Sequence, residues 1–164
     1  MEFEFQKYHG TGNDFILIND KSQKFPLDNS DKIRFLCDRK FGIGADGLII
    51  IRNHDKFVSE MFYFNSEWKM GSLCGNGGRC ALAFGINNNL LKNKVVFKAM
   101  DGIHTAKAES NNIFSLSFKD VKTIKRDKNA LFLDTGSPHY VELVENIDEI
   151  NVKAKGSLIR NSNR

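Results

Sequence analysis

Hydrophobic and polar positions alternate with period two along much of this chain, which predicts a protein built mainly from half-buried strands. Residues 3–9 alternate in this way, and the apolar run 15–19 follows after a loop that contains two glycines. Two strands joined by a tight turn are therefore expected at the start of the chain. Further strands are predicted at 48–52, 57–64, 94–99, 103–109, 113–118, 130–134 and 140–144.

Two segments instead follow the helical period. The first begins at Ser30, the predicted N-cap, runs to about Lys40 and ends at Phe41-Gly42. The second follows a glycine-rich segment and is apolar nearly all round from Cys80 to Ile86, so it should be buried. These patterns predict an α+β fold of mostly antiparallel strands wrapped on a central helix.

The segment 119–129 is basic, polar and poor in apolar residues, which favours a linker. We therefore expect an N-terminal domain over residues 1–118 and the beginning of a second domain over 119–164. Residues 156–164 begin a structure for which no apolar partner follows, so the second domain is expected to be incomplete.

Composition excludes several classes of protein. Of 164 residues, 41% are hydrophobic and 27% are charged, the usual balance of a globular domain. The net charge is +4, but lysines and acidic residues are interspersed, so binding to nucleic acid is not expected. Three cysteines, no signal peptide and no apolar run near 18 residues predict a cytoplasmic protein without a membrane segment.

The sequence Cys74-Gly75-Asn76-Gly77-Gly78 is the most informative chemical feature. A cysteine placed just before a helix faces free backbone N–H groups and the positive end of the helix dipole. Such a site can hold a thiolate, whereas only about 3% of an ordinary thiol is ionised at pH 7. The glycines also let a substrate approach the backbone closely. Cys74 is therefore predicted to be a reactive residue in an anion pocket.

Other interpretations of these residues are weaker. Cys37 and Cys80 lie in helical patterns and are predicted to be inert core residues. The spacing of Cys74 and Cys80 is not that of a zinc site, and no metal is expected. The glycines match neither the phosphate-binding loop nor the dinucleotide fingerprint.

Four glycine-containing loops together are similar, in order and spacing, to the N-terminal half of diaminopimelate epimerase. They are His9-Gly10-Thr11-Gly12-Asn13-Asp14-Phe15, Gly42-Ile43-Gly44-Ala45-Asp46-Gly47, Phe64-Asn65 with Cys74-Gly75-Asn76-Gly77, and Gly136-Ser137-Pro138-His139. The resemblance implies two similar domains, each a curled, mainly antiparallel sheet around a central helix, with the active site in the cleft between them.

The same resemblance implies an enzyme without cofactor that converts LL-2,6-diaminopimelate to its meso form, for lysine and cell-wall synthesis. In such enzymes one cysteine removes the α-proton as thiolate and another delivers a proton to the opposite face as thiol. The implied partner is a small-molecule substrate, and homodimers are one possibility for full-length relatives.

The resemblance also assigns roles to individual residues. Cys74 matches the catalytic cysteine of the N-terminal domain, and His139 matches a histidine that tunes the thiols. The residues matched to substrate binding are Asn13, Asn65, and Gly75 and Asn76 through their backbone N–H groups. Taken by itself, each asparagine is instead a turn residue that bonds its own backbone.

Some positions depart from the family pattern. Gly47 stands where many relatives have a substrate-contacting Gln, Ser137 stands where many have Asn, and residues 64–68 replace the commoner N-A-D-G turn. The family's second cysteine, in a G-A-C-G-[ST]-G loop, has no counterpart in residues 1–164. Cys80 cannot replace it, because six residues along a helix place it about 9 Å away.

We therefore expect this chain alone to be inactive as an epimerase. Two alternatives stay open on sequence grounds. One is a non-catalytic remnant or amino-acid-binding module, and the other is a cofactor-free racemase of a different amino acid.

Overall fold

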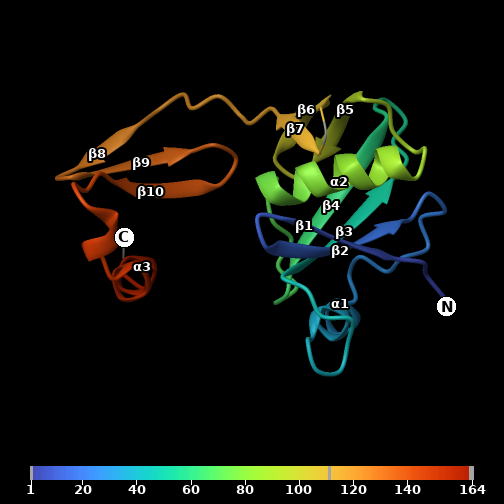
Figure 1. The fold of residues 1–164 in the computed structure, drawn as a ribbon, viewed down its shortest axis with the longest axis horizontal. Coiled ribbons are helices and arrows are strands. Elements are labelled where there is room, and N and C mark those ends of the chain that lie inside the picture. The colour runs from blue at the N-terminus through green and yellow to red at the C-terminus, as the bar shows by residue number, and fades with distance from the viewer. Residues whose placement is uncertain (1, 111, 163–164) are drawn as a thin grey trace. The chain divides into compact units, whose positions relative to one another are not determined.

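The computed structural model describes residues 2–110 and 112–162, which form two compact units. The first unit runs to Asp120 and includes the short segment Thr135–Ser137. Its elements are β1 (Gln6–Gly10), β2 (Asn13–Asn19), α1 (Ser30–Cys37), β3 (Gly47–Arg52), β4 (Ser59–Asn65), α2 (Gly75–Asn87), β5 (Lys94–Ala99), β6 (Gly102–Ser110) and β7 (Ile113–Leu116) (Figure 1). The second unit contains β8 (Lys125–Asp127), β9 (Ala130–Asp134), β10 (Pro138–Glu142), a short 3-10 helix (Ile147–Glu149) and α3 (Val152–Arg160).

The seven strands of the first unit form one curled sheet in the order of the sequence, β1 to β7. The pairs β2–β3 and β4–β5 are parallel, and the other neighbouring pairs are antiparallel. Each parallel pair needs a crossover connection, and α1 and α2 lie in those two connections. The predicted α+β fold with a mainly antiparallel sheet is thus confirmed.

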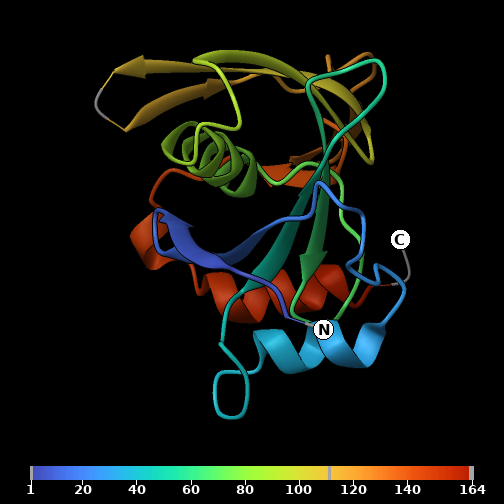
Figure 2. The same cartoon turned by 90° about the vertical axis from the view of Figure 1, so that its right-hand side faces the viewer.

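The two helices cover opposite faces of the central strands, as Figure 2 shows. Along β2, Phe15 and Leu17 belong to the core that includes α2, whereas Ile16 and Ile18 belong to the core that includes α1. Alternate residues of β3 divide between the two cores in the same way. Because both faces are covered, these strands are continuous apolar runs in the sequence rather than alternating ones.

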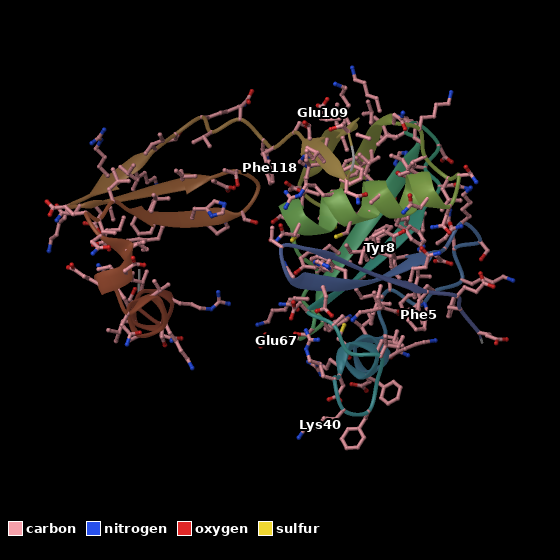
Figure 3. The ribbon with its side chains drawn as sticks, in the orientation of Figure 1. Phe5, Tyr8, Lys40, Glu67, Glu109 and Phe118 are labelled. Carbon is pink, nitrogen blue, oxygen red and sulfur yellow. The ribbon has the colours of Figure 1, made fainter. Side chains whose placement is uncertain are left out.

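Helix α2 is the central helix that the sequence predicts. The ring of Tyr8, on β1, meets Phe84 edge to face with 6.0 Å between centroids, and Asn87 Nδ2 donates to the Tyr8 hydroxyl at 3.0 Å (Figure 3). Cys80 in α2 and Cys37 at the end of α1 are both buried, as predicted. Packing on β1 therefore fixes the helix that begins just after Cys74.

The predicted boundaries of α1 are wrong at both ends. Asn29, not Ser30, is the N-cap, and its side chain accepts a hydrogen bond from Lys32 N at 2.9 Å. Ser30 is the first residue of the helix itself, so it cannot be the N-cap, which is the residue before it. The helix ends at Cys37 because the carboxylate of Asp38 accepts the N–H groups of the next turn, an alternative to helical hydrogen bonding.

The second unit differs from its prediction in three places. The polar segment expected to be a linker contains β8, an edge strand of the sheet β10-β9-β8. Pro138 and His139, expected in a turn, are the first residues of β10, and the turn shortens to three residues around Gly136 at φ +107°. The helix α3, which the sequence did not predict, covers Val152–Arg160.

Candidate functional site

Cys74 is the N-cap of α2, with an extended backbone at φ −85° and ψ 121°. Its Sγ accepts a hydrogen bond from Gly77 N at 3.5 Å, and its carbonyl oxygen accepts one from Gly78 N at 2.7 Å. This position is normally held by Ser, Thr, Asp or Asn, whose oxygen takes the same role. The sulfur therefore lies at the positive end of the helix with a backbone N–H directed at it.

Two further donors lie in the first turn of α2. The first N–H groups of a helix have no partner inside it. Within residues 2–110 and 112–162, no acceptor is found for the backbone N–H groups of Gly75 and Asn76. These two groups could therefore bind a carboxylate at the helix start.

The β1–β2 turn packs directly against this helix start. Asn13 Nδ2 lies 4.0 Å from Cys74 Sγ, and a Cβ added to Gly10 would lie 3.1 Å from the Cβ of Asn76. The turn residues Thr11 and Gly12 have φ of +55° and +87°, as in a two-residue hairpin turn of type I′. The two motifs that the sequence analysis singled out are thus in contact.

Two side chains frame Gly75 and Asn76. Arg79, one turn along α2, donates through Nη2 to the side-chain oxygen of Asn76. The ring of Phe118, labelled beyond β7 in Figure 3, lies 2.9 Å from where a Cβ on Gly75 would stand. A side chain at position 75 would therefore have to displace this ring.

Asn65 and Gly47 lie opposite each other in the β3–β4 register. Asn65 Oδ1 accepts hydrogen bonds from Glu67 N at 3.1 Å and Lys69 N at 2.8 Å, so this oxygen closes the turn (Figure 3 labels Glu67). Trp68 in that turn has φ +66°, where the commoner N-A-D-G turn has glycine. A Cβ at Gly47 would lie 2.6 Å from Phe64 O, so this position offers only its backbone.

The remaining predicted residues lie further along the chain. Ser137 is in the turn between β9 and β10, and His139 is the second residue of β10, in the second unit. The structure thus brings together Cys74, Gly75, Asn76 and Asn13, and it pairs Asn65 with Gly47. The roles of Ser137 and His139 stay predictions.

Sequence reasoning missed an ionic network that ties two glycine loops together. Arg39 Nη2 donates to Asp14 Oδ1 at 2.7 Å and to Asp46 Oδ1 at 2.8 Å, and Lys7 Nζ lies 2.7 Å from Asp14 Oδ2. The Arg39 guanidinium, and then Lys7, hold the pKa of the Asp14 carboxyl well below its usual range. The network fixes Asp14, the residue next to Asn13. In the sequence, the only sign of this network is that each of the two loops has an aspartate near its end.

The three cysteines differ in their surroundings. Burial raises the pKa of Cys37 and of Cys80 to about 11, so both are neutral thiols at pH 7. Cys74 is half-buried and free. It is the cysteine that a substrate could reach.

In the part of the chain that the structure describes, no three His, Cys, Asp or Glu side chains come together as a metal site would require. None of its helices is both long and apolar enough to cross a membrane.

Solved structures share this fold at low sequence identity. A probable proline racemase from Agrobacterium radiobacter with bound carbonate superposes with a TM-score of 0.64 and 13% identity, over 97% of this chain and 57% of that one. A phenazine biosynthesis protein of the PhzF family from Bacillus anthracis gives a TM-score of 0.61, also at 13% identity, over 89% of this chain and 56% of that one.

Curated relatives are much closer in sequence. The diaminopimelate epimerase of Flavobacterium psychrophilum is 47% identical over 95% of this chain, and that of Aquifex aeolicus is 34% identical over 96%. The chain spans 61% and 63% of the length of these two relatives. A sequence model of diaminopimelate epimerase matches residues 5–116, from just before β1 to the end of β7, and the chain therefore belongs to the diaminopimelate epimerase family.

Proposed function

We propose that this chain supplies one half of a cofactor-independent diaminopimelate epimerase, with Cys74 as an acid/base that faces the α-carbon. The observation that carries the proposal is the position of the Cys74 sulfur. It caps α2, accepts the Gly77 N–H at 3.5 Å and lies 4.0 Å from the amide of Asn13. The names of the curated relatives support the choice of substrate.

The first step is removal of the α-proton. The Cys74 thiolate takes the proton from the α-carbon and becomes a thiol, and the electron pair of the broken C–H bond stays on the carbon. The backbone N–H groups of Gly75 and Asn76 bind the α-carboxylate, which carries part of that charge. Asn13 and Asn65 bind the polar groups at the distal end of the substrate, and His139 adjusts the protonation of the thiols.

Inversion also needs a proton donor on the opposite face of the carbon. Cys80 follows Cys74 on the same helix, and Cys37 is buried on the other face of the sheet. Both are buried, so neither reaches that face. We therefore propose that a second cysteine outside residues 1–164 completes the site. The 164-residue polypeptide alone is expected to exchange the α-proton with retention and not to invert the centre.

The test is exchange of the α-proton of diaminopimelate in heavy water by the 164-residue chain, followed by proton NMR and chiral analysis. Exchange is expected for the wild type and for Cys37→Ala, and its loss for Cys74→Ala. Equal exchange in Cys74→Ala would refute the role of the thiol, and inversion by the wild type would refute the need for a second cysteine. Saturable binding without any exchange would favour the amino-acid-binding module instead.

A further inference from the structure

A buried acidic side chain reaches the backbone directly before Cys74. Asp101 lies in the turn between β5 and β6, and its side chain is only 8% exposed. Its Oδ1 accepts a hydrogen bond from the backbone N–H of Leu73 at 2.8 Å. Hydrogen bonds to a carboxylate are stronger than those to a neutral oxygen. Asp101 thus holds the peptide that immediately precedes the candidate catalytic residue.

The same carboxylate oxygen faces a buried histidine. His104, on β6, is 3% exposed, and its Nε2 lies 3.3 Å from Asp101 Oδ1. Nε2 makes no hydrogen bond to any described residue, so the two side chains are held in contact by packing. On its other side, His104 Nδ1 lies 3.0 Å from the carbonyl oxygen of Ser117. Since a carbonyl oxygen only accepts, Nδ1 carries a proton.

The pair is flanked by the Gly136 backbone on one side, where an added Cβ would clash with Asp101 Oδ2, and by an aromatic ring on another. The His104 ring lies 5.8 Å from the ring of Phe97, its partner in the β5–β6 register. A buried carboxylate without partners is costly, so the hydrogen bond from Leu73 N stabilises Asp101 in place. The chain of contacts therefore runs from the backbone after β7, through His104 and Asp101, to Leu73.

We propose that Asp101 and His104 are a positioning pair for Cys74. Consecutive Cα atoms are held about 3.8 Å apart, so the position of Leu73 sets where the Cys74 sulfur lies relative to Gly77 N. The pair touches no substrate and acts only through the backbone. This inference rests on the proposed role of Cys74 as the acid/base.

Alkylation of the native full chain by iodoacetamide, with the site identified by mass spectrometry, tests the inference. Asp101→Ala is expected to slow alkylation of Cys74 at least fivefold, because the sulfur leaves the N–H that stabilises its anion. Asp101→Asn, which retains an oxygen for Leu73 N–H, is expected to restore most of the rate. His104→Phe keeps an aromatic ring of similar size, and its rate of Cys74 alkylation is expected to lie between those of Asp101→Ala and Asp101→Asn. The control is Asp55→Ala, at an exposed aspartate in the β3–β4 connection, whose alkylation rate should match that of the wild type.

Amide hydrogen exchange separates positioning from general loss of stability. Exchange at Leu73, Gly77 and Gly78 is expected to rise at least tenfold in Asp101→Ala, while Phe84 near the end of α2 keeps its wild-type rate. A uniform rise along α2, or an alkylation rate that stays unchanged or increases, would overturn the inference. If Asp101→Ala does not fold, the NMR chemical shift of the Leu73 amide proton is compared between the wild type and Asp101→Asn. An upfield shift on loss of the carboxylate supports the pair, and no shift contradicts it.

The two proposals fail in different ways. A wild-type chain in which Cys74 reacts no faster than Cys37 or Cys80 would remove the basis of the proposed function. A reactive Cys74 whose rate is the same in Asp101→Ala would leave that function intact and refute only the positioning pair.

Discussion

At the scale of single residues, Asp20 is a buried acidic side chain that is paired with a cation, Arg52. Its side chain is fully buried, and it accepts hydrogen bonds from Lys24 N, Phe25 N and Arg52 Nε. Arg52→Ala removes the positive partner, so the carboxylate would stay buried without a compensating cation. Such changes cost about 3–5 kcal/mol. Urea unfolding at pH 7 followed by circular dichroism is expected to show a loss of this size.

The matched control is another arginine in a surface pair. Arg34 lies 3.8 Å from Asp31, and both side chains are largely exposed. Arg34→Ala is expected to change the free energy of unfolding by less than about 0.5 kcal/mol. Similar losses in the two variants would mean that Asp20 finds another partner or water.

At the scale of elements, the start of α1 offers a direct comparison of two neighbouring residues. Asn29 is the N-cap in the structure, and Ser30 is the N-cap that the sequence predicted. Asn29→Ala removes the oxygen that accepts Lys32 N–H and should cost about 1 kcal/mol of stability. Ser30→Ala lies inside the first turn and should change stability by no more than a few tenths of a kcal/mol. Thermal and urea unfolding of the two variants measure this difference. A larger loss for Ser30→Ala would restore the cap predicted from the sequence.

Elements with a buried face were predictable, whereas elements without one were not. Helix α2 and strands β2 and β3 pack into the cores, so their apolar residues appear in the sequence as a clear pattern. Helix α3 has no buried residue, and although Val152, Leu158 and Ile159 make it amphipathic, the sequence shows no core for them to face. Strand β8 is an edge strand with the sequence Lys125-Arg126-Asp127, and charged edge strands are typical of sheets that avoid aggregation. Its pattern is therefore that of a linker.

At the scale of the whole molecule, sequence motifs predicted the residues of the candidate site, but they did not predict the contacts that hold those residues in position. The hairpin with Asn13 and the loop with Cys74 were singled out by glycine, asparagine and cysteine in characteristic orders, and they meet in the structure. The supporting contacts join residues far apart in the chain, such as Arg39 with Asp14 and Asp101 with Leu73. No local pattern marks such pairs, because only the folded sheet brings them together.

The ionic network around Asp14 makes the stability of the first unit depend on pH. Arg39 and Lys7 hold the pKa of Asp14 below its value in the unfolded chain, about 3.9. The unfolded state therefore binds a proton first as the pH falls. The stabilisation is complete above the unfolded pKa and is lost as the pH falls through the folded one.

Comparison of the wild type with Asp14→Asn isolates this effect, because the amide keeps the size of the side chain and does not titrate. The urea midpoint of the wild type is expected to exceed that of Asp14→Asn by the same amount at pH 7 and pH 5, and the excess should shrink progressively below about pH 4. High salt should reduce the excess at pH 7, because the Arg39 side chain is 58% exposed. An excess that stays constant down to pH 2.5 would show that the difference between the two side chains does not arise from the charge of the Asp14 carboxylate.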